Sequence, residues 1–394
     1  MAFETEIVSD LAIILVAAGL VAFIFSRLRQ PLVLGFIIAG IIVGPFTPPF
    51  SLVSRLDFLH ALANLGVILL LFGLGLEFPV AKLKGLGAKI IGISLIEIGA
   101  MFAVSYILGI VLGLSTLESL FLGTALASSS TAIIVKSLTD MGKLHDLNAS
   151  LMLGILIVED LCVIILLAAL QSYSSLGSFD IAPVGWEIAK IVLFIGGTLG
   201  IGKFIIPRLI DWLAATREPE ILMITTVGLA FGFAYLGSSL GFSYAIGAFM
   251  MGVLMASSRA IKAVRRVTAY PRDIFGAIFF VSVGALIDIG QFSTFLIPAA
   301  LITLGMVLGK VLGIGAGTRL FGYGRHTALL VGLGMAQIGE FAFIVMQSGM
   351  TQGIIGQDLY SAIAIAVLIT TFTTPYLLRF GYRRMKKQLT ASQS

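Results

Sequence analysis

Apolar residues occur in long runs along the chain, and short polar segments rich in Gly, Pro or charged residues separate these runs. A membrane-spanning helix needs about 20 predominantly apolar residues, with a range of about 17–25. By this criterion the pattern predicts an all-α polytopic membrane protein with about 13 transmembrane helices. They cover residues 7–26, 31–46, 61–78, 89–113, 118–137, 149–170, 186–206, 219–237, 242–257, 273–289, 293–317, 327–348 and 358–379.

Composition strengthens this prediction. Of the 394 residues, 58% are hydrophobic and 11% are charged, whereas soluble domains average about 45–50% apolar and about 25% charged residues. A large soluble domain is therefore excluded. The single cysteine, Cys162, excludes a disulfide framework. The three histidines (His60, His145 and His326) lie near predicted loops, so neither a histidine-ligated metal site nor any other cofactor is expected.

The basic residues predict the orientation of the chain. If the N-terminus is outside, every Lys and Arg except Arg55, Lys190 and Lys310 falls on the inner side. Cytoplasmic loops of membrane proteins carry such an excess of Lys and Arg. We therefore expect a multi-pass protein of a prokaryotic cell membrane, with a transmembrane domain over residues 1–380. Residues 381–394 form a short basic cytosolic tail in this interpretation.

Three segments of the first half have similar counterparts in the second half, in the same order and at offsets of 209 to 212 residues. The pairs are 35–40 with 247–252, 70–77 with 281–288, and 123–132 with 332–341. The predicted topology runs paired helices in opposite directions across the membrane. The sequence thus predicts two inverted six-helix repeats, 1–170 and 219–380, joined by a linker helix at 186–206. Inverted repeats are typical of secondary transporters.

Charged residues inside spans identify the candidate chemistry, because each costs about 2.5–3.5 kcal/mol to insert. Glu159 and Asp160 are adjacent in one span, and Lys310 lies in another. Two neighbouring carboxylates in hydrocarbon cannot both stay ionised without a proton or a cation nearby. Oxygen ligands suit hard cations, so the pair predicts a site that exchanges protons for metal cations. Glu97 has no evident partner in the sequence, and we interpret it as a protonated helix-packing residue.

Two spans carry sequences that weaken a helix near their centres. Residues 127–132 read ASSSTA and include Ser129 and Thr131; their counterpart, 334–341, includes Gln337 and Glu340. Ser and Thr side chains compete for backbone hydrogen bonds. Broken helices at membrane depth are tolerated where they are buried in protein or line a wet cavity. The pattern predicts two broken helices whose ends point at an ion site near the membrane midplane.

These motifs resemble the monovalent cation:proton antiporter-2 family, which includes Kef-type and NapA-like membrane domains. The similar segments are ALASSSTAIIVKSLTDMG (125–142), ILIVEDL, AIGAFMMGVLMASS (245–258), FFVSVGALIDI (279–289), LGKVLG (308–313) and QIGEFAFIV (337–345). The resemblance implies the NhaA/NapA-like antiporter fold and a homodimer. Spans 4–6 and 11–13 would form a core with two crossing broken helices, and spans 1–3 and 8–10 the dimerisation side. The core would move like an elevator.

The resemblance also implies roles for single residues. Asp160 matches the invariant aspartate that binds the proton and, transiently, the metal ion. Glu159 precedes it, and Lys310 matches the charge-compensating lysine. Thr131 and Glu340 match polar groups at the crossover. NapA-like sodium antiporters have Asp where this chain has Glu159, and Kef-type potassium systems have Gln, so both Na⁺ and K⁺ stay open as substrates.

The expected function is therefore secondary active exchange of Na⁺ or K⁺ for H⁺ by alternating access. The alternative is a cation channel or K⁺ efflux pathway without obligatory proton coupling. Neither a nucleic-acid partner nor enzymatic activity is expected, because hydrolase motifs such as HExxH and GxSG do not occur. We further expect Glu159 and Lys310 to pair in the cation-free state. A cation arriving at Asp160 would then release a second proton from Lys310, giving two protons per cation. The alternative is that Glu159 and Lys310 form a permanent structural pair and only Asp160 titrates, giving one proton per cation.

Overall fold

The computed structural model consists of helices, and no strand occurs among the residues it describes. These residues are 2–28, 30–47, 51–53, 55–77, 87–143, 146–176, 193, 196–240, 244–288, 290 and 292–391. Seven helices in the described part are long and apolar enough to cross a membrane, and four apolar helices are shorter. The polytopic all-helical class predicted from the apolar runs is confirmed.

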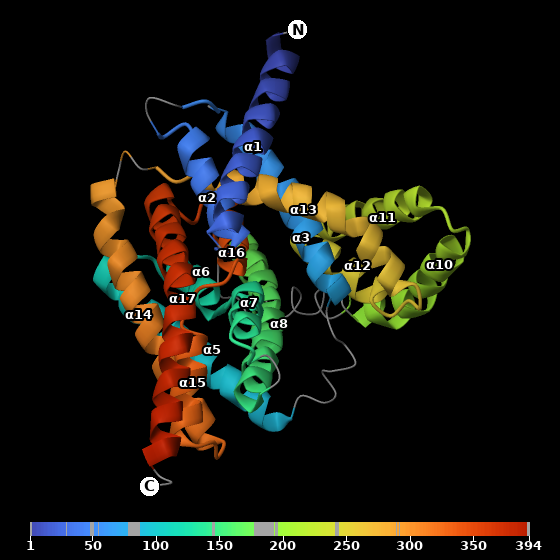
Figure 1. Cartoon of the computed structure of the whole chain (residues 1–394). Helices are drawn as coiled ribbons and strands as arrows, with labels where there is room; N and C mark the ends of the chain where they lie inside the picture. Colours follow the sequence, from blue (N-terminus) through green and yellow to red (C-terminus); the bar gives the residue numbers. More distant parts are fainter. Residues whose placement is uncertain are drawn as a thin grey trace. The chain divides into compact units, whose positions relative to one another are not determined.

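The helices follow one another as labelled in Figure 1. They are α1 (Ala2–Arg27), α2 (Leu32–Val43), α3 (Leu56–Glu77), α5 (Ala88–Leu112), α6 (Thr116–Ala127), α7 (Thr131–Asp140), α8 (Leu147–Leu176), the π-helix η1 (Thr198–Gly202), α10 (Lys203–Ala215), α11 (Pro219–Ser239), α12 (Tyr244–Met255), α13 (Ile261–Ala285), α14 (Phe292–Leu320), α15 (Arg325–Gly334), α16 (Phe341–Thr351) and α17 (Gln357–Ala391).

Several helix ends differ from the predicted spans. Helix α13 begins at Ile261 rather than at residue 273, because the basic residues before the apolar run are good helix formers. For the same reason α17 continues to Ala391, so the predicted tail is helical in its described part. Most of the predicted linker helix 186–206 lies outside the described residues. Its described end continues through η1 into α10, past residue 206.

The chain forms two compact units, each built from two separate stretches of sequence. Unit 1 contains residues 1–83 and 168–290, and unit 2 contains residues 84–167 and 291–394. Predicted spans 4, 5 and 11–13 therefore lie in unit 2 together with span 6 up to residue 167. This division agrees with the core that the family resemblance implied.

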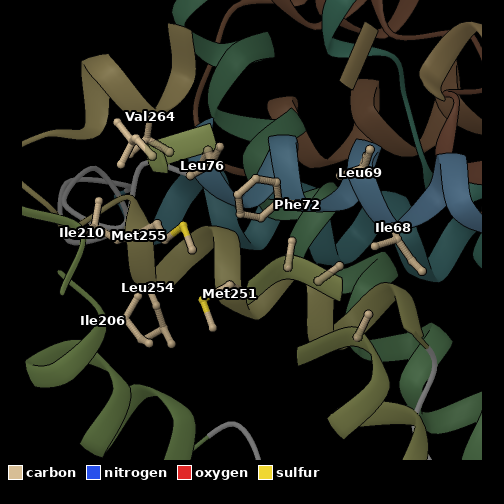
Figure 2. Packing of buried hydrophobic residues seen from close by; sticks show 14 of the residues in the cluster. Ile68, Leu69, Phe72, Leu76, Ile206, Ile210, Met251, Leu254, Met255 and Val264 are labelled. Carbon is tan, nitrogen blue, oxygen red and sulfur yellow. The ribbon is translucent and has the colours of Figure 1, made fainter. Parts of the chain in front are cut away.

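Unit 1 has an apolar interior. Figure 2 shows Phe72 and Leu76 of α3 packed near Met251 and Met255 of α12, with further apolar side chains from α10 and α13. Close approach of α3 and α12 depends on glycine, because a Cβ on Gly252 would lie 2.2 Å from the Phe72 carbonyl oxygen. Small residues at helix contacts are the usual means of close packing in membranes.

Unit 2 is organised around α14, which packs against α5, α15 and α17. Helix α5 also packs against α6, and α16 packs against α6 and α17. An apolar cluster that includes Ile134, Met152, Ile155 and Val331 joins α7, α8 and α15 within this unit. These contacts fix the two broken helices, α6–α7 and α15–α16, within one packed body.

Candidate functional site

The first predicted helix break lies between α6 and α7. Helix α6 ends at Ala127, and the backbone of Ser128 and Ser130 is extended. The Ser130 hydroxyl accepts a hydrogen bond from the backbone N–H of Ile133 at 3.4 Å and so caps α7. Serine suits this position because its side chain satisfies a backbone donor that the new helix leaves free. The run of hydroxyl residues therefore ends one helix and begins another.

The second break lies between α15 and α16 and crosses the first. The Gly339 N–H donates to the Ser128 carbonyl oxygen at 2.9 Å. The Gln337 side-chain amide donates to the Ser130 carbonyl oxygen at 3.1 Å. A Cβ on Gly339 would lie only 2.6 Å from the backbone carbon of Ser129, so glycine is required there. Both predicted breaks, and their crossing, are confirmed.

The crossing gathers four helix ends in one place. The carbonyl ends of α6 and α15 carry partial negative charge, and the amino ends of α7 and α16 carry partial positive charge. Such ends can stabilise both anionic side chains and a cation near the membrane midplane. Glu340 occupies the N-cap of α16 and is half-buried. The sequence therefore places an acidic side chain at a positive helix end.

Helix α8 brings Glu159 and Asp160 to this crossing. The Glu159 side chain is completely buried, and Asp160 is 7% exposed. Asp160 interacts with the Thr131 hydroxyl and with the charges of Glu340 and Glu159. Among the described residues, both oxygens of Glu159 and the Oδ1 atom of Asp160 have no hydrogen-bond partner. Buried carboxylate oxygens without partners are costly, and a proton or a hard cation would relieve that cost.

Lys310 of α14 points its ammonium into the same region and is completely buried. Its Nζ donates to the Ser129 Oγ at 2.6 Å and to the Ala127 carbonyl oxygen at 3.3 Å. It also forms ion pairs with Glu97 Oε1 at 3.3 Å and with Glu159 Oε2 at 3.7 Å. The ammonium therefore also binds the negative end of α6.

The position of Glu97 corrects the sequence interpretation. We expected a helix-packing residue without a partner, but Glu97 is a buried ion-pair partner of Lys310 and is nearer to it than Glu159. The expected pair of Lys310 and Glu159 is present as well. A usable signal existed in the sequence, because two isolated opposite charges in different spans each need compensation.

The seven predicted site residues and Glu97 thus fall into two neighbouring groups within unit 2. Asp160, Thr131 and Glu340 form the first group. Lys310, Glu159, Glu97 and Ser129 form the second, and Gln337 links the two broken helices through Ser130. Glu97, Glu159 and Asp160 are three buried carboxyl groups facing one buried ammonium. The cluster can approach neutrality only by taking up protons or a cation.

A pair of crossed broken helices around such a cluster defines a secondary active transporter of cations and protons. Comparison with known proteins leads to the same class. Residues 12–379 match the family model described as "Sodium/hydrogen exchanger, transmembrane". The chain belongs to this family of membrane transporters, and it exchanges monovalent cations for protons.

Individual relatives cover nearly the whole chain. It is 32% identical to the Na(+)/H(+)-K(+) antiporter GerN of Bacillus cereus, over 99% of this chain and 100% of that protein. It is 30% identical to the putative cation/proton antiporter YbaL of Escherichia coli, over 100% of this chain and 72% of YbaL. The solved structure of the sodium proton antiporter MjNhaP1 from Methanocaldococcus jannaschii matches with a TM-score of 0.73. That match covers 97% of this chain and 99% of MjNhaP1 at 17% identity, which supports the antiporter fold.

Proposed function

We propose that this chain exchanges Na⁺ or K⁺ for H⁺ at Asp160, by alternating access of the unit 2 site to the two sides of the membrane. The observation that carries this proposal is the buried carboxyl cluster at the crossing of α6–α7 and α15–α16. A carboxylate in that place can hold either a proton or a cation, but not both at once. Competition for one group is what couples the two fluxes.

Asp160 is the binding residue because its side chain interacts with the Thr131 hydroxyl and lies beside a helix break. In the cation-bound state, Asp160 and Glu159 supply negative charge, and Thr131 and Ser129 supply hydroxyl oxygens. These are the hard ligands that alkali cations prefer. When protons replace the cation, the carboxyl groups become neutral and the cost of burying their charge disappears.

The remaining site residues hold this arrangement. Lys310 compensates negative charge beside Glu159 and binds the carbonyl end of α6. Gln337 ties the second break to the first through the Ser130 carbonyl oxygen. Glu340 adds negative charge next to Asp160 at the amino end of α16. Because all these residues lie in unit 2, the binding site can move as one body during alternating access.

We further propose the setting in which this exchange takes place. Residues 1–380 form the transmembrane domain of a homodimer in a prokaryotic cell membrane, and 1–170 and 219–380 are the inverted repeats. The segment 186–206 links the repeats, and 381–394 is a basic cytosolic extension. The inner-side excess of Lys and Arg supports an external N-terminus and a cytoplasmic C-terminus.

The test is proton movement in proteoliposomes that contain the purified chain and an internal pH dye. Na⁺, K⁺ and Li⁺ are added in turn, with choline as the inert cation. We expect cation-driven alkalinisation or acidification, in the direction set by the gradients, with at least one alkali ion. Cation flux without proton movement would instead establish the channel or uncoupled K⁺ efflux pathway.

The variant Asp160→Asn tests the site itself. Its amide can neither release a proton nor present a full negative charge to a cation, so exchange should fall to the level of empty liposomes. The matched control is Asp358→Asn, which makes the same change at an exposed position of α17 in unit 2. Thermal unfolding in detergent should show that both variants are folded. Exchange retained in Asp160→Asn would remove this residue from the centre of the mechanism.

A further inference from the structure

The Lys310 ammonium has more acceptors within reach than it has hydrogens. Four groups surround its Nζ: the Ser129 Oγ, the Ala127 carbonyl oxygen, and the carboxylates of Glu97 and Glu159. An ammonium carries three donors, and the first two groups use two of them. The two carboxylates therefore compete for the third hydrogen, and Glu97 is the nearer one at 3.3 Å against 3.7 Å.

Helix packing holds Glu97 at this distance. Helix α14 presents glycines at every fourth position to α5, from Gly305 to Gly317. A Cβ on Gly313 would lie 2.8 Å from the Ala100 Cβ and 3.4 Å from the Glu97 Cα. A helix face of glycines lets two backbones approach closely. The backbone of Glu97 is therefore held close to the helix that carries Lys310.

Glu159 is less closely paired with Lys310 than Glu97 is. It comes from α8, directly before Asp160, and has the longer ion-pair distance. The oxygens of both glutamates lack hydrogen-bond partners among the described residues, so the longer distance and the place beside Asp160 are what set Glu159 apart. Its carboxylate can therefore turn to a cation at Asp160 while the charge of Lys310 stays compensated by Glu97.

We propose that Glu97 is the standing charge partner of Lys310 and thereby keeps Glu159 available for exchange beside Asp160. This inference rests on the proposed function of Asp160. Glu97 acts through Lys310 and is a positioning residue that sets the number of charges moved in each cycle. Two carboxyl groups then exchange two protons for one cation, and Lys310 keeps its proton. This differs from the scheme in which Lys310 supplies the second proton.

The first test identifies the partner of Lys310 without any transport measurement. Melting temperatures in detergent at pH 8.5 are compared for Lys310→Gln alone and combined with Glu97→Gln or Glu159→Gln. Lys310→Gln should melt lower than the wild type, because it leaves buried carboxylates without a cation. Neutralising Glu97 should restore most of this loss, and neutralising Glu159 should restore less. Equal or better restoration by Glu159→Gln would overturn the proposal.

The second test measures stoichiometry at the point where no net proton movement occurs. In the wild type, an imposed potential of about 60 mV should shift the balancing cation gradient about tenfold, as expected when one net charge moves per cycle. In Glu97→Gln, Lys310 should turn to Glu159 and leave Asp160 alone to exchange. The balancing gradient should then be independent of the potential, although exchange continues.

The cation gradient at which no net proton movement occurs depends on stoichiometry and not on how much protein is folded. A merely structural role of Glu97 would therefore leave it unchanged. The control is Glu118→Gln, the same chemical change in the exposed capping box of α6, where Gln also serves. An unchanged tenfold shift in Glu97→Gln would overturn the proposal, and so would a wild type indifferent to the potential. Failure of the proposed function is recognised separately, by exchange that survives in Asp160→Asn.

Discussion

The two units are built from similarly apolar helices but differ in what they bury. The interior of unit 1 around α3 and α12 consists of side chains such as Phe72, Met251 and Leu254 (Figure 2). The interior of unit 2 contains Lys310 and Glu97, both completely buried, beside the carboxylates of α8. Unit 1 can therefore serve as a scaffold, whereas unit 2 contains a cluster of buried charged side chains.

This difference supports the proposal that unit 2 carries the exchange site. Helices in lipid gain little from the hydrophobic effect against each other, and close packing of small and apolar residues is sufficient to join them. Unit 1 uses this inexpensive solution, as the contact of Gly75 with Gly252 illustrates. Buried charges in unit 2 lower stability unless they are compensated. The proposed exchange at Asp160 gives these buried charges a role that packing does not require.

The largest loss of exchange is expected at the crossing of the two helix breaks in unit 2. Gly339→Ala would place a Cβ 2.6 Å from the Ser129 backbone and force the two breaks apart. Displacing a site by about 1 Å can cost about 100-fold in rate, so we expect at least that loss of exchange in proteoliposomes. The control is Gly99→Ala in α5 of the same unit, where a Cβ meets no atom within 4 Å.

The melting temperatures of the two glycine variants are measured together with their exchange rates. Gly339→Ala should melt lower than the wild type, and Gly99→Ala should melt at the wild-type temperature or above it, because Ala favours a helix. Wild-type exchange in Gly339→Ala would mean that the contact between the breaks is unnecessary for transport.

Much of unit 2 could be predicted from local sequence. The Ser run at 128–130 and the glycines around Gln337 weaken helices through local backbone chemistry, which a sequence displays directly. Glu159, Asp160 and Lys310 are visible because charge is rare in apolar runs. The repeat offset then pairs the two breaks without knowledge of the structure.

Tertiary contacts and helix ends were harder to predict. The pairing of Glu97 with Lys310 depends on which face of α14 meets α5, and that face is selected by glycines whose partners the sequence does not show. The start of α13 at Ile261 was missed because an apolar window excludes basic residues that nevertheless continue a helix. An apolar window identifies the residues that lie within the membrane, whereas the ends of a helix depend on backbone hydrogen bonding.

A change in the apolar interior of unit 1 should affect stability and spare the site. Phe72 is 1% exposed, and Phe72→Ala would leave a cavity between α3 and α12. We expect a loss of about 3 kcal/mol in the free energy of unfolding, the lower end for Phe→Ala in protein cores. The cation KM of the folded fraction should stay at the wild-type value, because the binding residues lie in unit 2.

Phe72→Leu is the conservative partner and should lose less stability, since it fills part of the cavity. Unfolding in detergent and initial rates in proteoliposomes measure the two properties separately. A changed cation KM in the folded fraction of Phe72→Ala would contradict the assignment of cation binding to unit 2 alone.

The smallest effects are expected from single hydroxyl groups in unit 2, one beside Asp160 and one beside Lys310. Thr131→Val removes the hydroxyl that interacts with Asp160, and one such group contributes about 1 kcal/mol. The cation KM should therefore rise about fivefold with a smaller change in maximal rate. Ser129→Val should also raise the KM, and it should lower the melting temperature more, because it removes the 2.6 Å hydrogen bond to Lys310. Thr139→Val, at an exposed position of α7, is the matched control. An unchanged KM in both Thr131→Val and Ser129→Val would place the cation elsewhere than at the break between α6 and α7.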